Sequence, residues 1–141
     1  MSQITASLVK ELREKTGVGM MDCKTALKEN NGDIEASIDW LRTKGIAKAA
    51  KKEGRIASEG LIAIEKIDNI ASIIEVNSET DFVAMNEDFQ NVVKKLSVLS
   101  TKSNNLEDLL EKELEDKDIK VKDYITEMIA SIGENLSLIH I

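Results

Sequence analysis

The chain has no proline and very few of the residues from which disulfides, metal sites and catalytic triads are built. In 141 residues it has one cysteine, Cys23, and one histidine, His140. A single cysteine excludes an internal disulfide and a cysteine cluster for zinc. A single histidine leaves almost nothing from which to build a histidine metal site or a catalytic triad. We therefore expect no metal site and no cofactor, and the absence of proline favours a helix-rich chain with short turns.

Aromatic residues make up 3% of the chain although 42% of it is hydrophobic, which predicts an aliphatic core. No segment approaches the roughly 20 apolar residues that a membrane-spanning helix needs. Met1–Thr5 also lacks the basic and apolar regions of a signal peptide. These absences predict a cytoplasmic protein with no membrane partner.

The charges are divided unevenly along the chain. Residues 1–55 carry 11 Lys and Arg against 8 Asp and Glu, whereas residues 56–141 carry 8 against 18. This change predicts a boundary near residue 55, with one domain at 1–54 and a second at 55–141.

The acidic balance argues against nucleic acid as a direct partner, because such affinity rests largely on Lys and Arg that neutralise phosphates. A short basic run, Lys48, Lys51, Lys52 and Arg55, could contact a phosphate backbone. A solvated helix face explains the same run more simply, and we expect that explanation to hold.

The first 54 residues predict three amphipathic helices and a helical extension. The first begins after Thr5 and ends at Gly17, the second ends at an Asn-Asn-Gly turn, and Asp33 caps the third, with Trp40 close to its end. The extension is expected to stop at Gly54. The residues expected to face inward are Ile4, Leu8, Val9, Leu12, Met21, Cys23, Ala26, Leu27, Ile34, Ile38 and Leu41.

Val18, Met20 and Met21 suggest a docking face on this helical bundle. Methionine is flexible and polarizable and is common at adaptable binding surfaces, and the loop position makes some of these side chains hard to bury. The alternative, that one or both methionines close the small core, stays open at this point. The Gly-Val-Gly loop around Val18 does not predict a nucleotide site, because no strand precedes it and the P-loop's Gly-Lys-Ser/Thr ending is missing.

The remainder of the chain predicts a small antiparallel sheet with helices on one face. Residues 61–65 and 70–76 have the composition of strands and are joined by a turn-like segment, 66–69, as in a hairpin. Three helical patterns follow. Their apolar positions are Phe89, Val92, Val93 and Leu96; then Leu106, Leu109, Leu110 and Leu114; then Ile125, Met128, Ile129 and Ile132, ending at Gly133. The fold class is therefore α+β.

The segment Thr80-Asp81-Phe82-Val83 lies where the second strand gives way to a helix. Phe82 is one of only two phenylalanines in the chain, and it follows a carboxylate. Residue chemistry alone favours Asp81 as a helix cap and Phe82 as a core residue, because most aromatic side chains are buried. Junctions between elements also present side chains outward, so an exposed Phe82 is the alternative.

Two segments together resemble the signature motifs of the elongation factor Ts family. They are Leu-Arg-Glu-Lys-Thr-Gly-Val-Gly-Met-Met-Asp-Cys-Lys-Thr-Ala-Leu at residues 12–27 and Glu-Val-Asn-Ser-Glu-Thr-Asp-Phe-Val-Ala at residues 75–84. Their order and spacing also resemble the family, and the resemblance extends from Met1 to about Leu136. One departure is Met85, where the family usually carries a basic or amide side chain.

The resemblance implies a guanine-nucleotide exchange factor for the GTPase elongation factor Tu. It implies that the first three helices are similar to a ubiquitin-associated domain and dock on the nucleotide-binding domain of the GTPase. It also implies that Thr80, Asp81, Phe82 and Val83 displace magnesium from the GTPase. The family core has two similar halves, and the resemblance implies that this chain stops at the end of the first. Residues 132–136 resemble the start of a further strand, whereas residues 137–141 depart from the basic continuation expected for the family.

The mechanism implied by the resemblance is competition between two bound states. A GTPase holds GDP through magnesium and through backbone amides around the phosphates. An apolar ring wedged into that site would weaken the nucleotide by the same free energy by which the nucleotide weakens the factor. Phe82 is the expected wedge, with Asp81 beside it as a charge and acceptor, and Thr80 and Val83 holding the turn.

Two other functions fit parts of the sequence. A non-catalytic interaction module that uses the three-helix bundle explains residues 1–45 but gives the Asp81-Phe82 junction no role. A thiol enzyme would need a base near Cys23, and the only histidine, His140, is near the end of the chain. The sequence does not determine the oligomeric state.

Overall fold

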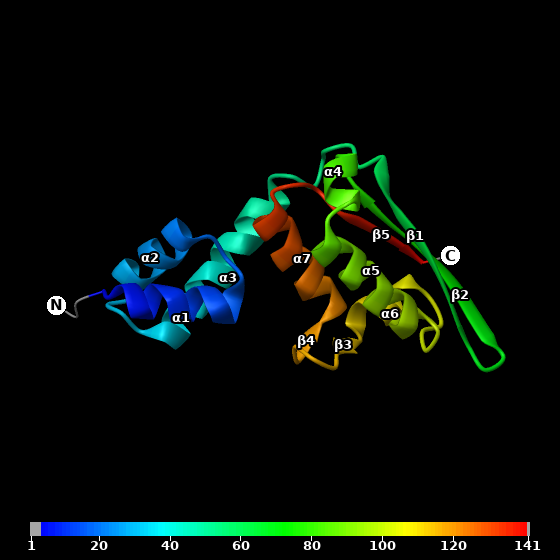
Figure 1. Ribbon diagram of the computed structural model, residues 1–141, viewed down its shortest axis with the longest axis horizontal. Helices are drawn as coiled ribbons and strands as arrows, with labels where there is room; N and C mark the ends of the chain where they lie inside the picture. The colour runs from blue at the N-terminus through cyan, green and yellow to red at the C-terminus, as the bar shows by residue number, and fades with distance from the viewer. Residues whose placement is uncertain (1–3, 141) are drawn as a thin grey trace.

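The computed structural model describes residues 4–140 and shows an elongated molecule with helices at one end and a sheet at the other (Figure 1). Met1–Gln3 and Ile141, at the outer limits of the two predicted domains, lie outside the described residues. The elements are α1 (Ala6–Thr16), α2 (Met20–Glu29), α3 (Ile34–Ala50), β1 (Glu59–Ile67), β2 (Ile70–Ser78), α4 (Asp81–Ala84), α5 (Glu87–Ser100), α6 (Leu106–Glu111), β3 (Glu113–Leu114), β4 (Ile119–Lys120), α7 (Val121–Ile132) and β5 (Ser137–His140). The predicted α+β class is confirmed.

The first and third helices begin after their predicted cap residues, Thr5 and Asp33. The Thr5 hydroxyl accepts from the Leu8 amide at 3.3 Å, and the Asp33 carboxylate accepts from the Ala36 amide at 2.9 Å. Gly17 ends α1 with a φ of 67°. Because each helix has one apolar face, the three pack around a small core. Its buried members are Val9, Leu12, Cys23, Ala26, Leu27 and Leu41.

The third helix is longer than the sequence predicted. It runs through Trp40 to Ala50, so the expected helix end near Trp40 is wrong, and the helix itself stops before Gly54. Gly45 does not break it, because this position faces α7: a Cβ there would lie 3.4 Å from the Ala130 Cβ. The helix therefore reaches from the first core to the second, which includes Ala49. The domain boundary near residue 55 stays a prediction.

A three-stranded antiparallel sheet with the order β1-β2-β5 forms the other end of the molecule. The predicted hairpin is confirmed, with a turn of only Asp68 and Asn69; Asp68 has a φ of 53°, as tight hairpin turns require. Helix α5 lies across one face of the sheet. The second core fills the space between them, with Ile74, Val76, Phe89, Val92, Val93, Leu96, Leu109, Val121, Met128, Ile129 and Leu138 among its buried side chains.

Leu114 was expected to continue the apolar face of the preceding helix, and this was wrong. Helix α6 ends at Glu111, and Leu114 is buried in β3, where it pairs with Ile119 of β4. An apolar residue spaced for a helix can equally fill a core from a short strand. Within residues 4–140 no helix is long and apolar enough to cross a membrane.

Candidate functional site

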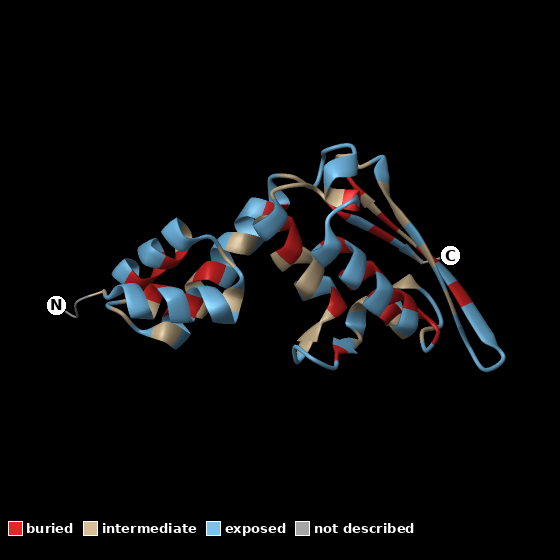
Figure 2. Ribbon diagram, in the orientation of Figure 1, coloured by how far each residue is buried: buried red, intermediate tan, exposed pale blue. Residues whose placement is uncertain are grey.

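The Asp81-Phe82 turn leaves the sheet at the end of β2 and presents its aromatic ring to solvent. Phe82 is 83% exposed, whereas Ala84 is buried and Val83 packs against the second core. The short helix α4 therefore holds the chain by Val83 and Ala84 and turns Asp81 and Phe82 outward, as the exposed surface of α4 in Figure 2 illustrates. The interpretation of Phe82 as a core residue is wrong, because the aliphatic core is already filled by Phe89 and its neighbours.

The backbone that precedes Phe82 in the sequence is held by the carboxylate of Glu134, which lies near the C-terminal end of the chain. Glu134 Oε2 accepts from the amides of Glu79 (3.1 Å) and Thr80 (3.0 Å), and Glu134 Oε1 accepts from the Thr80 hydroxyl (2.6 Å). The Ser78 hydroxyl donates to the Thr80 carbonyl at 2.9 Å. Thr80 occupies the N-cap position of α4 without a side-chain cap bond. Its hydroxyl holds the turn to Glu134 instead.

The three residues of the predicted docking face differ in exposure. Met20 and Met21 begin α2 and are 55% and 72% exposed, so the expectation that Met21 faces inward is wrong. Val18 is half-buried against the first core. The two methionines are free to meet a partner, and Val18 links that surface to the core. Whether they do so stays a prediction.

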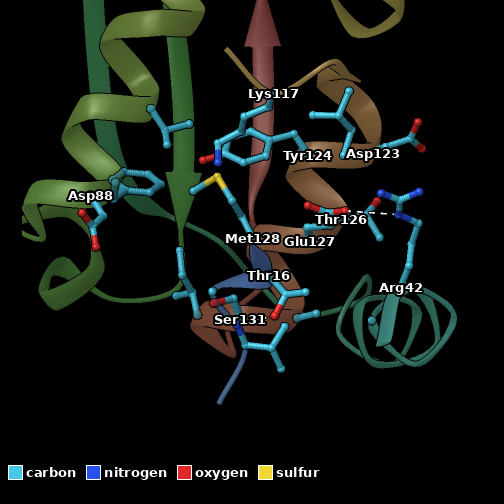
Figure 3. A pocket seen from close by; sticks show the side chains of 18 of the residues that line it. Thr16, Arg42, Asp88, Lys117, Asp123, Tyr124, Thr126, Glu127, Met128 and Ser131 are labelled. Carbon is cyan, nitrogen blue, oxygen red and sulfur yellow. Dashed lines mark hydrogen bonds and ion pairs between the residues drawn. The ribbon is translucent and has the colours of Figure 1, made fainter. Parts of the chain in front are cut away.

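A cleft of about 1060 Å³ lies between the helical end of the molecule and the sheet end, and Val18, Phe82 and Val83 all line it. Figure 3 shows Tyr124 and Met128 of α7 on its wall, with the ion pair that joins Arg42 of α3 to Glu127 of α7 at 3.4 Å across it. The structure therefore places one member of the predicted docking face and two of the predicted displacing segment around a single hollow. Met20 and Met21 do not line it.

Two titratable side chains near these surfaces, Cys23 and Tyr124, have pKa values shifted by burial. Burial raises the pKa of the Cys23 thiol, which donates to the Val18 carbonyl at 3.5 Å. Burial also raises the pKa of Tyr124. A thiol held in its neutral form is a poor nucleophile. Cys23 therefore serves the core of the helical bundle and the loop that carries Val18.

Most of the basic run discussed above is engaged within the chain. Lys48 forms an ion pair with Asp22 at 2.7 Å, Lys52 donates to the Gly133 carbonyl at 2.6 Å, and Arg55 lies 3.6 Å from the Glu79 carboxylate. These contacts favour a structural role for the run over a phosphate-binding one.

Sequence reasoning gave no role to Glu79 and Glu134. Each is one charged residue in a polar loop, and neither sits in a spacing that suggests a function. Their contact joins segments about 55 residues apart. No local pattern could have shown it.

Comparison with known proteins finds similarity to elongation factor Ts proteins. The family model described as "Elongation factor TS" matches residues 79–141. Proteins named "Elongation factor Ts" from Methylobacterium sp. (strain 4-46), Azorhizobium caulinodans and Parvibaculum lavamentivorans are 55%, 55% and 54% identical to this chain over 139 residues. The match covers 98% of this chain and 45% of each of these relatives, so the chain spans less than half their length. The similarity therefore extends beyond the two motifs to nearly the whole length of this chain, which is similar to a part of proteins named elongation factor Ts that is less than half their length.

Proposed function

We propose that this chain is a translation elongation factor that binds elongation factor Tu in its GDP-bound state and promotes GDP release. The observation that carries the proposal is the exposed ring of Phe82 on a turn held by Thr80 and Val83. An exposed aromatic side chain on a rigid support is suited to insertion into a partner, because little conformational freedom is lost on binding. The similarity to elongation factor Ts proteins suggests the partner and the reaction.

In the proposed mechanism, binding of the factor and binding of GDP with magnesium oppose each other. The ring of Phe82 enters between the elements that support the magnesium site, and Asp81 brings an acceptor and a negative charge next to them. The amides and the metal that hold the phosphates then lose their geometry. By linkage, binding of this chain lowers the GTPase's affinity for GDP, and GDP lowers the GTPase's affinity for this chain by the same ratio. No covalent bond is made or broken, so we propose that the protein is an exchange factor and not an enzyme.

The shared cleft supports one partner that contacts both ends of the molecule. Val18 packs against the first core, and Val83, the neighbour of Phe82, packs against the second, yet Val18 and Phe82 line the same hollow. A GTPase domain docked on the face formed by Val18, Met20 and Met21 would meet the cleft at Val18, and Phe82 lines the same cleft. This arrangement needs α3 as a continuous support between the two ends.

The test is release of a fluorescent GDP analogue from elongation factor Tu in stopped flow, with increasing concentrations of this chain and excess unlabelled GDP. The proposal predicts that the release rate rises with the chain's concentration and saturates. A rate that never exceeds the spontaneous one would refute it. If the GTPase is nevertheless retained on the immobilised chain, and added GDP does not release it, the alternative of a plain interaction module on the three-helix bundle is favoured.

A further inference from the structure

The turn that carries Phe82 is fixed by a reciprocal clamp between two loops. The Glu134 carboxylate accepts all three bonds described above, using both of its oxygens. In return, the Asn135 amide donates to Glu79 Oε1 at 2.7 Å. Each loop thus supplies a carboxylate to the backbone of the other. Bonds of this kind to a charged acceptor are stronger than neutral ones, and both Glu79 and Glu134 are partly buried.

The loop that carries Glu134 is itself fixed at its base. Gly133 ends α7 with a φ of 87°, a conformation that side-chain-bearing residues rarely adopt. The Gly133 carbonyl accepts from Lys52 Nζ, and Asn135 Nδ2 donates to the Arg55 carbonyl at 2.8 Å. The loop is therefore tied to the segment that follows α3. Glu134 reaches the Phe82 turn from a support with little freedom of its own.

We infer that Glu134 is the positioning residue of the exchange site: by holding the turn, it sets the direction in which the Phe82 ring points into solvent. The inference rests on the proposed function. Val83 and Ala84 hold the turn by packing, and the side-chain hydrogen bonds made with Thr80 are those to Glu134 and the one from Ser78. The Thr80 hydroxyl donates its proton to Glu134, so Thr80 supports the turn through this bond.

Two of these bonds join Glu134 to Thr80, which lies two positions before Phe82. The Thr80 amide and hydroxyl both donate to the Glu134 carboxylate, and Thr80 is the N-cap residue that directly precedes α4. Loss of the carboxylate would leave two amides and one hydroxyl without acceptors in a partly buried loop. Such groups turn toward water. The start of α4 would then loosen while Val83 and Ala84 stay packed, and the ring would sample many directions.

The first test is amide hydrogen exchange by NMR on the 141-residue chain. Glu134→Ala is expected to speed exchange of the Glu79 and Thr80 amides by about tenfold or more, since each loses its acceptor, while the amides of β2 keep their protection. Glu134→Gln keeps one acceptor oxygen and should restore part of the protection. Glu115→Ala, an exposed loop carboxylate, is the matched control and should change nothing. Unchanged exchange at both amides, or faster exchange throughout the sheet, would overturn the inference.

The second test is a double-mutant cycle on GDP release at saturating chain. Glu134→Ala should slow release about fivefold when Phe82 is present and add nothing in a Phe82→Ala background, because a positioning residue acts only through the residue it positions. Equal slowing in both backgrounds would refute the positioning role in favour of a general loss of stability. If the unmutated chain does not accelerate release at all, the proposed function fails, and the hydrogen-exchange result alone decides whether Glu134 holds the turn.

Discussion

The two phenylalanines of this chain allow the same substitution to be made once on the surface and once in the core. Phe82 is 83% exposed and Phe89 is fully buried, although only seven positions separate them. Phe82→Ala is the informative change, and Phe89→Ala is its matched control. The proposed function requires the first to reduce exchange without reducing stability, and the second to reduce stability.

The expected magnitudes follow from burial. A phenylalanine buries roughly 200 Å² when fully enclosed, so a ring that is about one-sixth buried loses roughly 35 Å² of contact. At about 25 cal/mol per Å² this is less than about 1 kcal/mol, and the better helix propensity of alanine offsets part of it. We therefore expect Phe82→Ala to lower the free energy of unfolding by about 0.5 kcal/mol or less. Phe89→Ala should cost about 3–5 kcal/mol.

The assay pairs thermal unfolding by circular dichroism with stopped-flow release of a fluorescent GDP analogue. For Phe82→Ala we expect an unfolding midpoint within about 2 °C of the unmutated chain, together with slower GDP release. For Phe89→Ala we expect a midpoint lower by on the order of 10 °C or more. The loss caused by Phe82→Ala should shrink when a chelator has already removed magnesium. A large stability loss, or release as fast as before, would refute the wedge.

Three further predictions concern other surfaces. Replacing the exposed Met20 and Met21 with lysine should weaken association with the GTPase, measured by its retention on the immobilised chain, while the helical circular dichroism signal is kept; lost helicity would contradict their exposure. Because burial raises the pKa of Cys23, iodoacetamide at pH 8 should label this thiol slowly in the folded chain and rapidly in denaturant, and equal labelling rates would show an accessible thiolate. The raised pKa also implies a contribution to folding stability that is present below the thiol's unfolded pKa and lost as pH rises through its folded pKa. Hydrogen bonds from Lys120 and Lys122 lower the pKa of Glu111 to about 2. The difference in folding stability between the unmutated chain and Glu111→Gln should therefore be present above the unfolded pKa of Glu111 and vanish as pH falls through about 2. Urea unfolding across this pH range measures the difference, and a difference that persists at the lowest pH would refute its ionic origin.

Helix starts and apolar faces were determined by the sequence itself. Asn86 begins α5 by accepting from the Phe89 amide, and Gly133 ends α7 at the predicted residue. Caps and apolar periodicity act over three or four residues, so the local sequence contains the information needed to predict them. The β-hairpin was predictable for the same reason, since its two strands are adjacent in the chain.

The tertiary structure alone decided the features that depend on distant residues. Phe82 is exposed because other side chains already fill the core, and its own neighbours in sequence carry no sign of that. Helix α3 passes its glycine because α7 packs there, and Leu114 is a strand residue because β4 pairs with it. The contact of Glu134 with Thr80 spans 54 positions and requires the end of α7 to meet the end of β2. Local propensity determines which elements form, but packing among all of them determines which side chains remain available to a partner.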